Sequence, residues 1–316
     1  MSRTSELERV ALLAARFGRH APGALVGIGD DAAVLQAVAT PLVWTIDAQV
    51  EGTHFRLDWL SWQDVGWRSF MAAASDVAAM GASPIAALSS LVLAEHVDDA
   101  ALDALAAGQA DAAREVGAPV VGGNLARGSE TSITTTVLGA TDRAILRSGA
   151  RPGDGLFVAG PLGLAAAGLV ALQTGAPRGP DVDACIEAWR RPRALIGQGL
   201  AMRARATAAV DVSDGLSRDA SHVAASSGVM LVFDEARLRA GAAGALERAA
   251  AALGRDPLDF VLGGGEDYAL LVASPAPAID GFERIGTVES GPAGLSLARI
   301  DGTRAPIDAR GFDHFG

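Results

Sequence analysis

The chain has 316 residues, of which half are apolar and a fifth are charged, and its formal net charge is −11. This length favours two domains, and the acidic balance argues against a nucleic-acid partner, because contacts with a phosphate backbone need clustered cations. All 26 basic residues are arginine, which excludes mechanisms that depend on a catalytic or phosphate-binding lysine.

The composition also bears on location and redox chemistry. No apolar run approaches the roughly 20 residues of a membrane-spanning helix, and the first residues, MSRTSELERV, show no signal-peptide pattern. The single cysteine, Cys185, excludes an intrachain disulfide and a cysteine-cluster metal site, and we interpret it as a small apolar residue on a helix. We therefore expect a cytoplasmic protein.

The first half of the chain is predicted to mix strands and helices in an α+β domain. Ser5 and Glu8 have the spacing of a capping box, and Ser61 precedes a second helix that Gly81 ends. From these signals and from apolar periodicity, helices are expected at 5–17, 62–80 and 98–116, and strands at about 42–47, 85–93, 118–122 and 132–140. The residues that follow the first strand, AQVEGTHF, are expected to form a loop.

The second half is predicted to alternate strands with helices, which favours an α/β domain. Strands are expected at 155–160, 208–213 and 229–234, and helices at 161–173, around 183–205, from Asp214 onward and in an alanine-rich stretch before a glycine-rich turn that enters a strand within 261–273. The turn-forming segment RSGARPGDG, 147–155, separates the two halves. The expected domains are therefore 1–148 and 149–316, and the expected fold class is α/β.

Five short segments place aspartate or glutamate where a strand or helix meets a glycine-containing turn. They are GIGDDAA (27–33), TIDAQVEGTHF (45–55), SDVAAMG (75–81), DVSDGLSRD (211–219) and GGGEDY (263–268). Any one of these segments alone is consistent with ordinary turn or helix-capping chemistry. Asp219, the last residue of the fourth segment, is expected to be solvated. Together the five segments place carboxylates beside apolar strands, where a carboxylate needs a cation or a hydrogen-bond donor. An all-oxygen set without lysine favours Mg²⁺ or Mn²⁺, which in turn recruits nucleotide phosphates.

The first of these segments contains two adjacent carboxylates, Asp30 and Asp31, which repel each other at neutral pH. If the segment enters a strand, the two side chains point to opposite faces and do not chelate one ion together. We therefore expect Asp31 to be the direct, bridging metal ligand. Asp30 is expected to bind a second ion, a water molecule or the N–H groups of the turn.

Three further features have both a structural and a binding interpretation. The segment GGNLARG, 122–128, is expected to form a turn whose N–H groups can approach a phosphate. Arg147 follows a strand and borders the expected cleft between the domains, where an arginine can contact a phosphate. His54 is either a satisfied loop histidine or a ligand contact.

The motifs GIGDDAAV, VEGTHF, SDVAAMGASP, RSGARPGD, DVSDGL, GGGEDYAL and GFDHF occur in an order and spacing that resembles bacterial thiamine-monophosphate kinases. Those enzymes belong to the superfamily of aminoimidazole ribonucleotide synthetase and selenophosphate synthetase. VEGTHF, GGGEDY and GFDHF are the motifs typical of the thiamine-phosphate branch. The resemblance implies ATP-dependent phosphorylation of thiamine monophosphate to thiamine diphosphate, several Mg²⁺ ions, and a nucleotide bound between two domains. It also implies a homodimer whose N-terminal sheets pair into a barrel.

The same resemblance implies roles for individual residues. The implied metal ligands are Asp30, Asp31, Thr45, Asp47, Asp76, Asp211 and Asp214. The implied ATP contacts are Gly123, Asn124, Arg147 and Ser213, and the implied substrate contacts are His54, Glu266 and Phe312. No general base is expected, because the acceptor is a phosphate monoester that is already ionised at neutral pH.

The chain departs from the family pattern at three positions. Asn124 stands where aspartate is frequent, Ile46 where a hydroxyl residue is common, and Phe312 where tyrosine or tryptophan is usual. The neutral amide of Asn124 reduces the charge offered to one metal ion. Two alternatives therefore stay open: another ATP-dependent synthetase of the superfamily, and a non-catalytic paralogue that binds nucleotide or Mg²⁺.

Overall fold

The computed structural model describes residues 5–18, 22–29 and 32–312. The chain divides into two compact units. One unit runs to Val77 and resumes from Ala82 to Asp142, and the other comprises Ala78–Gly81 and the chain from Arg143 onward. The domain boundary expected at 148/149 stays a prediction, since the compact units change six residues earlier and exchange a short segment.

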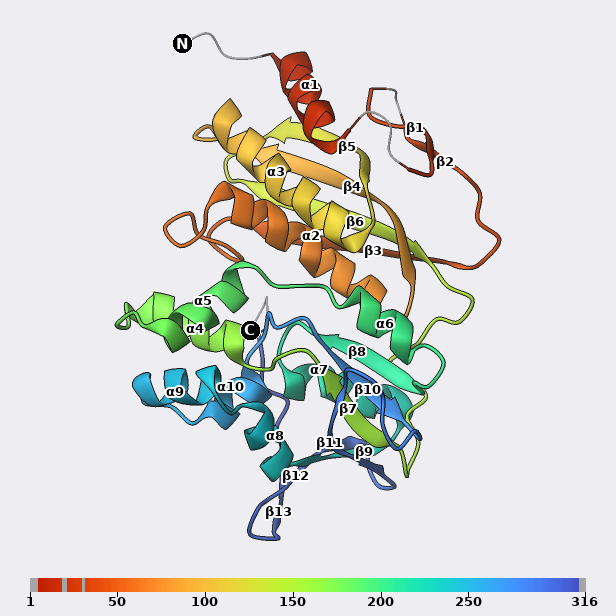
Figure 1. Cartoon of the computed structure of the whole chain (residues 1–316), viewed down its shortest axis with the longest axis vertical. Coiled ribbons are helices and arrows are strands. Elements are labelled where there is room, and N and C mark those ends of the chain that lie inside the picture. Colours follow the sequence, from red (N-terminus) through yellow and green to blue (C-terminus); the bar gives the residue numbers. More distant parts are fainter. Residues whose placement is uncertain (1–4, 19–21, 30–31, 313–316) are drawn as a thin grey trace. The chain divides into compact units, whose positions relative to one another are not determined.

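The first unit contains a four-stranded sheet with helices on one face (Figure 1). Its helices are α1 (Glu6–Phe17), α2 (Trp62–Ala79) and α3 (Asp99–Val116), and its strands are β1 (Ala24–Val26), β2 (Val34–Leu35), β3 (Leu42–Val50), β4 (Ser83–Leu93), β5 (Val120–Arg127) and β6 (Ser132–Ala140). The strand order is β3-β6-β4-β5, with β5 parallel to β4 and the other pairs antiparallel. Strands β1 and β2 form a separate antiparallel pair.

The predicted helix starts are confirmed, because they depend on local hydrogen bonds. Ser5 and Glu8 form a complete capping box on α1, and Asp98 caps α3 by accepting the Ala101 N–H at 2.8 Å. Ser61 accepts the Asp64 N–H at 3.2 Å at the start of α2.

Two strand boundaries differ from the predictions in this unit. Strand β3 continues to Val50, so part of the expected loop is strand. The expected turn at 122–128 is wrong, because 122–127 continue β5. A Cβ atom at Gly123 would lie 1.8 Å from the Ser89 carbonyl oxygen, so this glycine permits close strand pairing rather than a reversal of the chain.

The second unit contains a seven-stranded sheet of order β13-β12-β9-β11-β7-β10-β8. Its strands are β7 (Gly155–Ala159), β8 (Ala208–Val212), β9 (Met230–Asp234), β10 (Ala269–Ser274), β11 (Glu283–Glu289), β12 (Gly294–Ala298) and β13 (Arg304–Pro306). Its helices are α4 (Leu164–Thr174), α5 (Pro180–Arg190), α6 (Ile196–Met202), α7 (Leu216–Ser227), α8 (Glu235–Gly241), α9 (Ala245–Ala252) and α10 (Pro257–Gly263). Among the described strands of this sheet, only β9 and β12 pair in parallel. The mixed α/β fold class is confirmed.

The central strands of this sheet are buried on both faces. Strands β7, β8 and β10 are buried along their whole length. On β7, Leu156 and Val158 pack into one apolar cluster, and the alternate residues Phe157 and Ala159 pack into another, as the two-residue period of a strand requires. Cys185 is fully buried on α5, and burial raises the pKa of its thiol to about 11. Within the described residues, no helix is long and apolar enough to cross a membrane.

Candidate active site

In the first unit, three of the predicted metal ligands come together at the edge strand β3. Thr45 and Asp47 are two residues apart on β3, so their side chains lie on the same face of the sheet. Asp76 lies on α2, and its carboxylate accepts a hydrogen bond from the Thr45 hydroxyl. The strand and the helix therefore present hydroxyl and carboxylate oxygens to one place.

This oxygen set fits Mg²⁺ better than a softer metal. Mg²⁺ is usually held by one or two carboxylates and keeps several water molecules, which nucleotide phosphates can replace. Among the residues that the structure describes, no group of three or more His, Cys, Asp or Glu side chains gathers at one point. Asp30 and Asp31, two of the predicted ligands, lie outside the described residues.

The structure does not bring Gly123 and Asn124 to this group. Asp47 is paired through Thr135 and Ser89 to Gly123, so it is separated from Gly123 by the whole width of the sheet, about 14 Å at the usual strand spacing. Asn124 is paired with Ser90 and lies on the opposite face. The two residues therefore belong to a different part of the unit from Thr45, Asp47 and Asp76.

A buried polar network supports the row of residues beside Asp47. Gln109 on α3 accepts a hydrogen bond from the Ser89 hydroxyl at 2.9 Å and donates to Ser69 at 3.2 Å and to Thr135 at 3.3 Å. All four side chains are buried. No sequence signal identifies this network, because Gln109 lies in an ordinary helical pattern.

His54 is held by the turn that follows β3. Its Nδ1 accepts the Val50 N–H at 3.1 Å, and its own N–H donates to the Val50 carbonyl oxygen at 2.8 Å. A neutral His54 therefore carries its ring hydrogen on Nε2, which leaves Nε2 as the ring atom able to donate.

In the second unit, three motifs that are far apart in the sequence meet at the carboxyl end of β8. The Glu266 N–H donates to the Ser213 carbonyl at 2.7 Å, and the Phe312 N–H donates to the Asp214 carbonyl at 3.1 Å. Asp211 lies on β8, two residues before Ser213, and is only 4% exposed. The structure thus brings together five of the predicted site residues: Asp211, Ser213, Asp214, Glu266 and Phe312.

Glycine permits this close contact. A Cβ atom at Gly265 would lie 2.5 Å from the Ser213 carbonyl oxygen, and one at Gly311 would lie 2.3 Å from the Asp214 carbonyl oxygen. Both distances are far below van der Waals contact, so neither position accepts a larger residue without movement of the backbone. Gly265 of the GGGEDY motif and Gly311 of the GFDHF motif are therefore required by packing.

Asp219 corrects an expectation, because it is buried rather than solvated. Only 3% of its surface is exposed, and its Oδ2 accepts the N–H groups of Ser213, Asp214 and Gly215 at 3.0 to 3.1 Å. Burial raises the pKa of this carboxyl to about 7, while the three hydrogen bonds oppose the rise and the charge of Asp214 adds to it. The only sequence signal was its position in the first turn of α7, where capping and structural carboxylates are common.

Glu266 has a backbone conformation that a non-glycine residue rarely adopts. Its φ is +65°, and Tyr268 has a φ of +51°. The Glu266 carboxylate accepts a hydrogen bond from the indole N–H of Trp189, which is buried on α5. Left-handed backbone at two such residues persists only where surrounding contacts hold it, and it is frequent at ligand sites. Trp189 was not identified from the sequence.

Asp267 lies between these two residues and caps α4. Its carboxylate accepts the Gly163 N–H at 2.6 Å and the Ala165 N–H at 3.1 Å. Burial raises the pKa of Asp267 to about 7, the two N–H groups oppose the rise, and the charge of Glu266 adds to it. The segment 266–268 is therefore held by α5 through Trp189 and Glu266, and by α4 through Asp267.

We expect Asp267 to make stability depend on pH. The folded chain keeps the proton of Asp267 up to about pH 7, whereas an unfolded aspartate loses it near pH 4. The stabilising contribution of this group is thus complete below about pH 4 and is lost as the pH rises to 7. The free energy of unfolding of the wild type minus that of Asp267→Asn should fall by at most about 1.4 kcal/mol per pH unit in this window. Urea unfolding at several pH values measures it, and a difference independent of pH would contradict the prediction.

Arg147 is exposed, and its backbone lies at the C-terminal end of α7. Its carbonyl accepts the Ser227 hydroxyl at 3.3 Å. Burial lowers the pKa of His222, and the charges of Arg147 and Arg218 lower it further. Arg218 forms an ion pair of 3.7 Å with Asp214 at the start of this helix.

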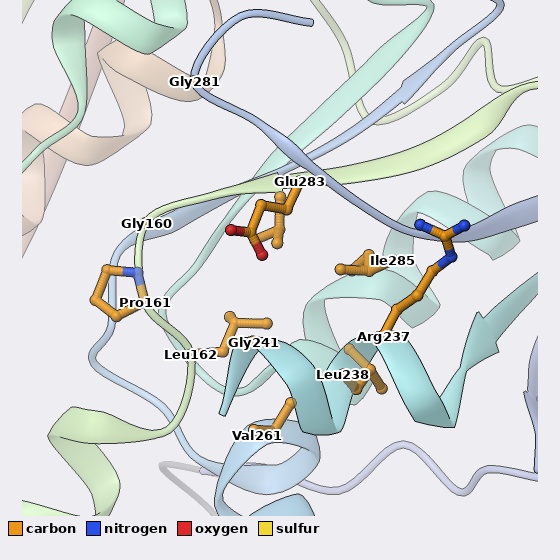
Figure 2. Close-up of a pocket in the computed structure, with 11 residues that line it drawn as sticks. Gly160, Pro161, Leu162, Arg237, Leu238, Gly241, Val261, Gly281, Glu283 and Ile285 are labelled. Carbon is orange, nitrogen blue, oxygen red and sulfur yellow. The ribbon is translucent and has the colours of Figure 1, made fainter. Parts of the chain in front are cut away.

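A groove elsewhere in the second unit is separate from these residues. It has a volume of about 320 Å³ and lies between β7, β11 and α8 (Figure 2). Figure 2 shows the Glu283 carboxylate directed into the groove and the Arg237 guanidinium directed away from it. None of the described residues with a predicted role lines it.

Comparison with known proteins places this fold and site in a class. The family model for the N-terminal domain of AIR synthase related proteins matches residues 29–141. A thiamine-monophosphate kinase of Mycobacterium tuberculosis is 40% identical over 283 residues, which are 87% of this chain and 83% of that protein. The chain belongs to the thiamine-monophosphate kinase family.

Solved structures agree with this membership. The thiamine-monophosphate kinase from Stenotrophomonas maltophilia K279a has a TM-score of 0.83 at 33% identity and covers 95% of this chain and 98% of its own. The structure of AaThiL complexed with AMPPCP and TMP has a TM-score of 0.80 at 31% identity, and the match covers 100% of this chain and 99% of that one. The family resemblance predicted from the motifs is confirmed.

Proposed function

We propose that this chain phosphorylates thiamine monophosphate with ATP and yields thiamine diphosphate. The observation that carries the proposal is the match, along the whole chain, to the structure of AaThiL complexed with AMPPCP and TMP. The contact between the GGGEDY loop and the DVSDGL turn also supports the proposal, because it places polar groups and close-packed glycines in one site. We also propose a cytoplasmic location, where ATP is available.

The proposed residue roles cover the two groups of side chains and also residues outside them, among them Gly123 and Asn124 across the sheet from Asp47. Thr45, Asp47 and Asp76 in the first unit and Asp211 and Asp214 in the second are proposed to hold Mg²⁺, together with Asp30 and Asp31. Gly123, Asn124, Arg147 and Ser213 are proposed ATP contacts, and His54, Glu266 and Phe312 are proposed substrate contacts. Bound Mg²⁺ would supply positive charge to the phosphates, as lysine does in other kinases.

The proposed reaction is direct transfer of the γ-phosphoryl group to the acceptor phosphate. The acceptor oxygen is already ionised, so the chain has no proton to remove from it. The main barrier is the approach of two polyanions, and the role of the protein is to hold them in line and to offset their repulsion. Arg147 can do this directly, and the carboxylates can do it by holding cations. No phosphorylated enzyme forms in this scheme.

A coupled assay with purified protein, thiamine monophosphate, ATP and Mg²⁺ tests the function. Formation of thiamine diphosphate and ADP in equal amounts is the expected result. ATP binding without turnover would favour a non-catalytic paralogue, and turnover only with another acceptor would favour a different synthetase of the superfamily. Detection of a phosphorylated protein during turnover would contradict direct transfer.

We propose a homodimer that covers the helix-free face of the first sheet. That face carries large apolar side chains that are exposed in the single chain: Leu42 at 56%, Trp44 at 70%, Ile46 at 66% and Leu88 at 37%. Contiguous apolar surface on a sheet is typical of an interface rather than of a solvated face. Pairing of two such sheets into a barrel would bury it.

Ile46→Asp is expected to convert the dimer into monomers, because it places a charge in the middle of that face. Sedimentation velocity at micromolar concentration measures the change. Ile300→Asp is a matched control, since Ile300 is also 66% exposed but belongs to the second unit. A monomeric wild type, or an Ile46→Asp variant that sediments like the wild type, would contradict the proposed interface.

A further inference from the structure

The segment after β13 is held against the first turn of α7 by one buried side chain. The Ser217 hydroxyl accepts the Arg310 N–H at 3.1 Å and donates to the Arg310 carbonyl at 2.9 Å. Ser217 is 1% exposed. One hydroxyl thus satisfies both backbone groups of Arg310, so the attachment does not depend on the arginine side chain.

The next two residues continue this attachment. The Phe312 N–H donates to the Asp214 carbonyl at 3.1 Å. A Cβ atom at Gly311 would lie 2.3 Å from the Asp214 oxygen and 2.9 Å from Cβ of Arg218. The backbone of 310–312 therefore lies directly on the turn that carries Ser213 and Asp214.

We propose that Ser217 is a positioning residue that docks residues 310–312 on α7 and thereby sets where the ring of Phe312 meets the acceptor. Phe312 is 47% exposed, so burial of the ring alone does not hold it in place. The backbone contacts at Arg310 and Phe312 supply the constraint. The inference rests on the proposed function, in which Phe312 contacts the heteroaromatic part of thiamine monophosphate.

Tryptic cleavage after Arg310 reports the docking without any assay of activity. Ser217→Ala removes both hydrogen bonds, and we expect it to lose residues 311–316 about tenfold faster than the wild type, measured by intact mass. Ser221→Ala is the matched control. It removes a hydroxyl one turn further along the same helix, which donates to the Arg218 carbonyl at 2.6 Å and has no hydrogen bond to the described residues 310–312.

Kinetics report the consequence for the acceptor. Ser217→Ala should raise the KM for thiamine monophosphate about tenfold and leave kcat and the KM for ATP nearly unchanged. Phe312→Ala should raise the same KM without faster cleavage after Arg310. The double variant should show little further increase, because both changes remove one contact.

Cleavage of Ser217→Ala at the wild-type rate would overturn the docking role. Faster cleavage with an unchanged KM for thiamine monophosphate would overturn the positioning of Phe312. If Ser217→Ala does not fold, Gly311→Ala tests the same contact from the C-terminal side, with the same expected cleavage and KM. Absence of turnover in the wild type would refute the proposed function, and the cleavage assay would still decide the docking.

Discussion

Asp47→Asn is expected to reduce kcat about a thousandfold or more. The substitution keeps the shape of the side chain but removes its charge from the β3 edge, where the Thr45 hydroxyl and the Asp76 carboxylate are already hydrogen-bonded to each other. Loss of one anionic ligand would weaken the binding of Mg²⁺. The phosphoryl transfer would then lose several kcal/mol of the charge stabilisation that the ion supplies. Steady-state rates at saturating ATP and increasing Mg²⁺ measure the effect.

Thermal unfolding separates a lost metal ligand from a misfolded chain. Asp47→Asn keeps the size and shape of the side chain, so the variant should still unfold cooperatively without metal. The stabilisation that Mg²⁺ and ATP give the wild type should decrease, because a ligand stabilises in proportion to its affinity for the folded state. Asp58→Asn is the control, since Asp58 is exposed in the same unit and pairs only with Arg56 among the ion pairs described. Near-normal activity of Asp47→Asn would refute the metal assignment.

Asp219→Ala is expected to lower the free energy of unfolding by roughly 3 kcal/mol. It leaves three backbone N–H groups, those of Ser213, Asp214 and Gly215, without the acceptor they share. Because two of these residues are proposed metal and ATP contacts, activity should fall as well. Asp219→Asn should lose less, since a single oxygen, Oδ2, accepts all three bonds and the amide oxygen of asparagine can take its place. Chemical unfolding of the wild type and both variants measures this ranking.

Asp259→Ala is the matched control for this prediction. Asp259 also lies in the first turn of a helix, α10, but its side chain is exposed. Its removal should cost at most about 1 kcal/mol, the usual contribution of an exposed carboxylate near a helix start. Equal losses from Asp219→Ala and Asp259→Ala would show that the three hydrogen bonds contribute little.

The elements with local signals were predictable. The helix starts at Ser5, Ser61 and Asp98 follow from side chains that bond N–H groups three residues away, so a short window of sequence contains both partners. The turn expected at 122–128 failed for the opposite reason. Position 123 requires glycine because the Ser89 carbonyl oxygen of the neighbouring strand leaves no room for a Cβ atom. In the sequence, a glycine required by packing looks the same as one required by a turn.

The arrangement of the candidate site could not be predicted from the sequence, and its predicted metal chemistry stays a prediction. The acidic motifs and the absence of lysine indicated oxygen ligands and metal-assisted phosphate chemistry, and Glu266 was identified in its motif. No sequence signal identified Trp189, which donates to Glu266, or Ser217, which bonds the backbone of Arg310. Each lies in an ordinary helical pattern, and its partner is far away in the sequence. Asp219 was misjudged for the same reason: its burial depends on the turn that folds over it.

By itself, the sequence determined the class of fold, the capped helices, the acidic motifs and, through their order, the family. The tertiary structure alone decided which motifs meet: it joins Ser213 to Glu266 and Asp214 to Phe312, and it separates Asn124 from Asp47 by the width of a sheet. The physical reason is the range of the interactions. Caps and turns are specified by neighbours in the chain, whereas strand order, register and the burial of a carboxylate are set by packing between residues that are far apart in the sequence.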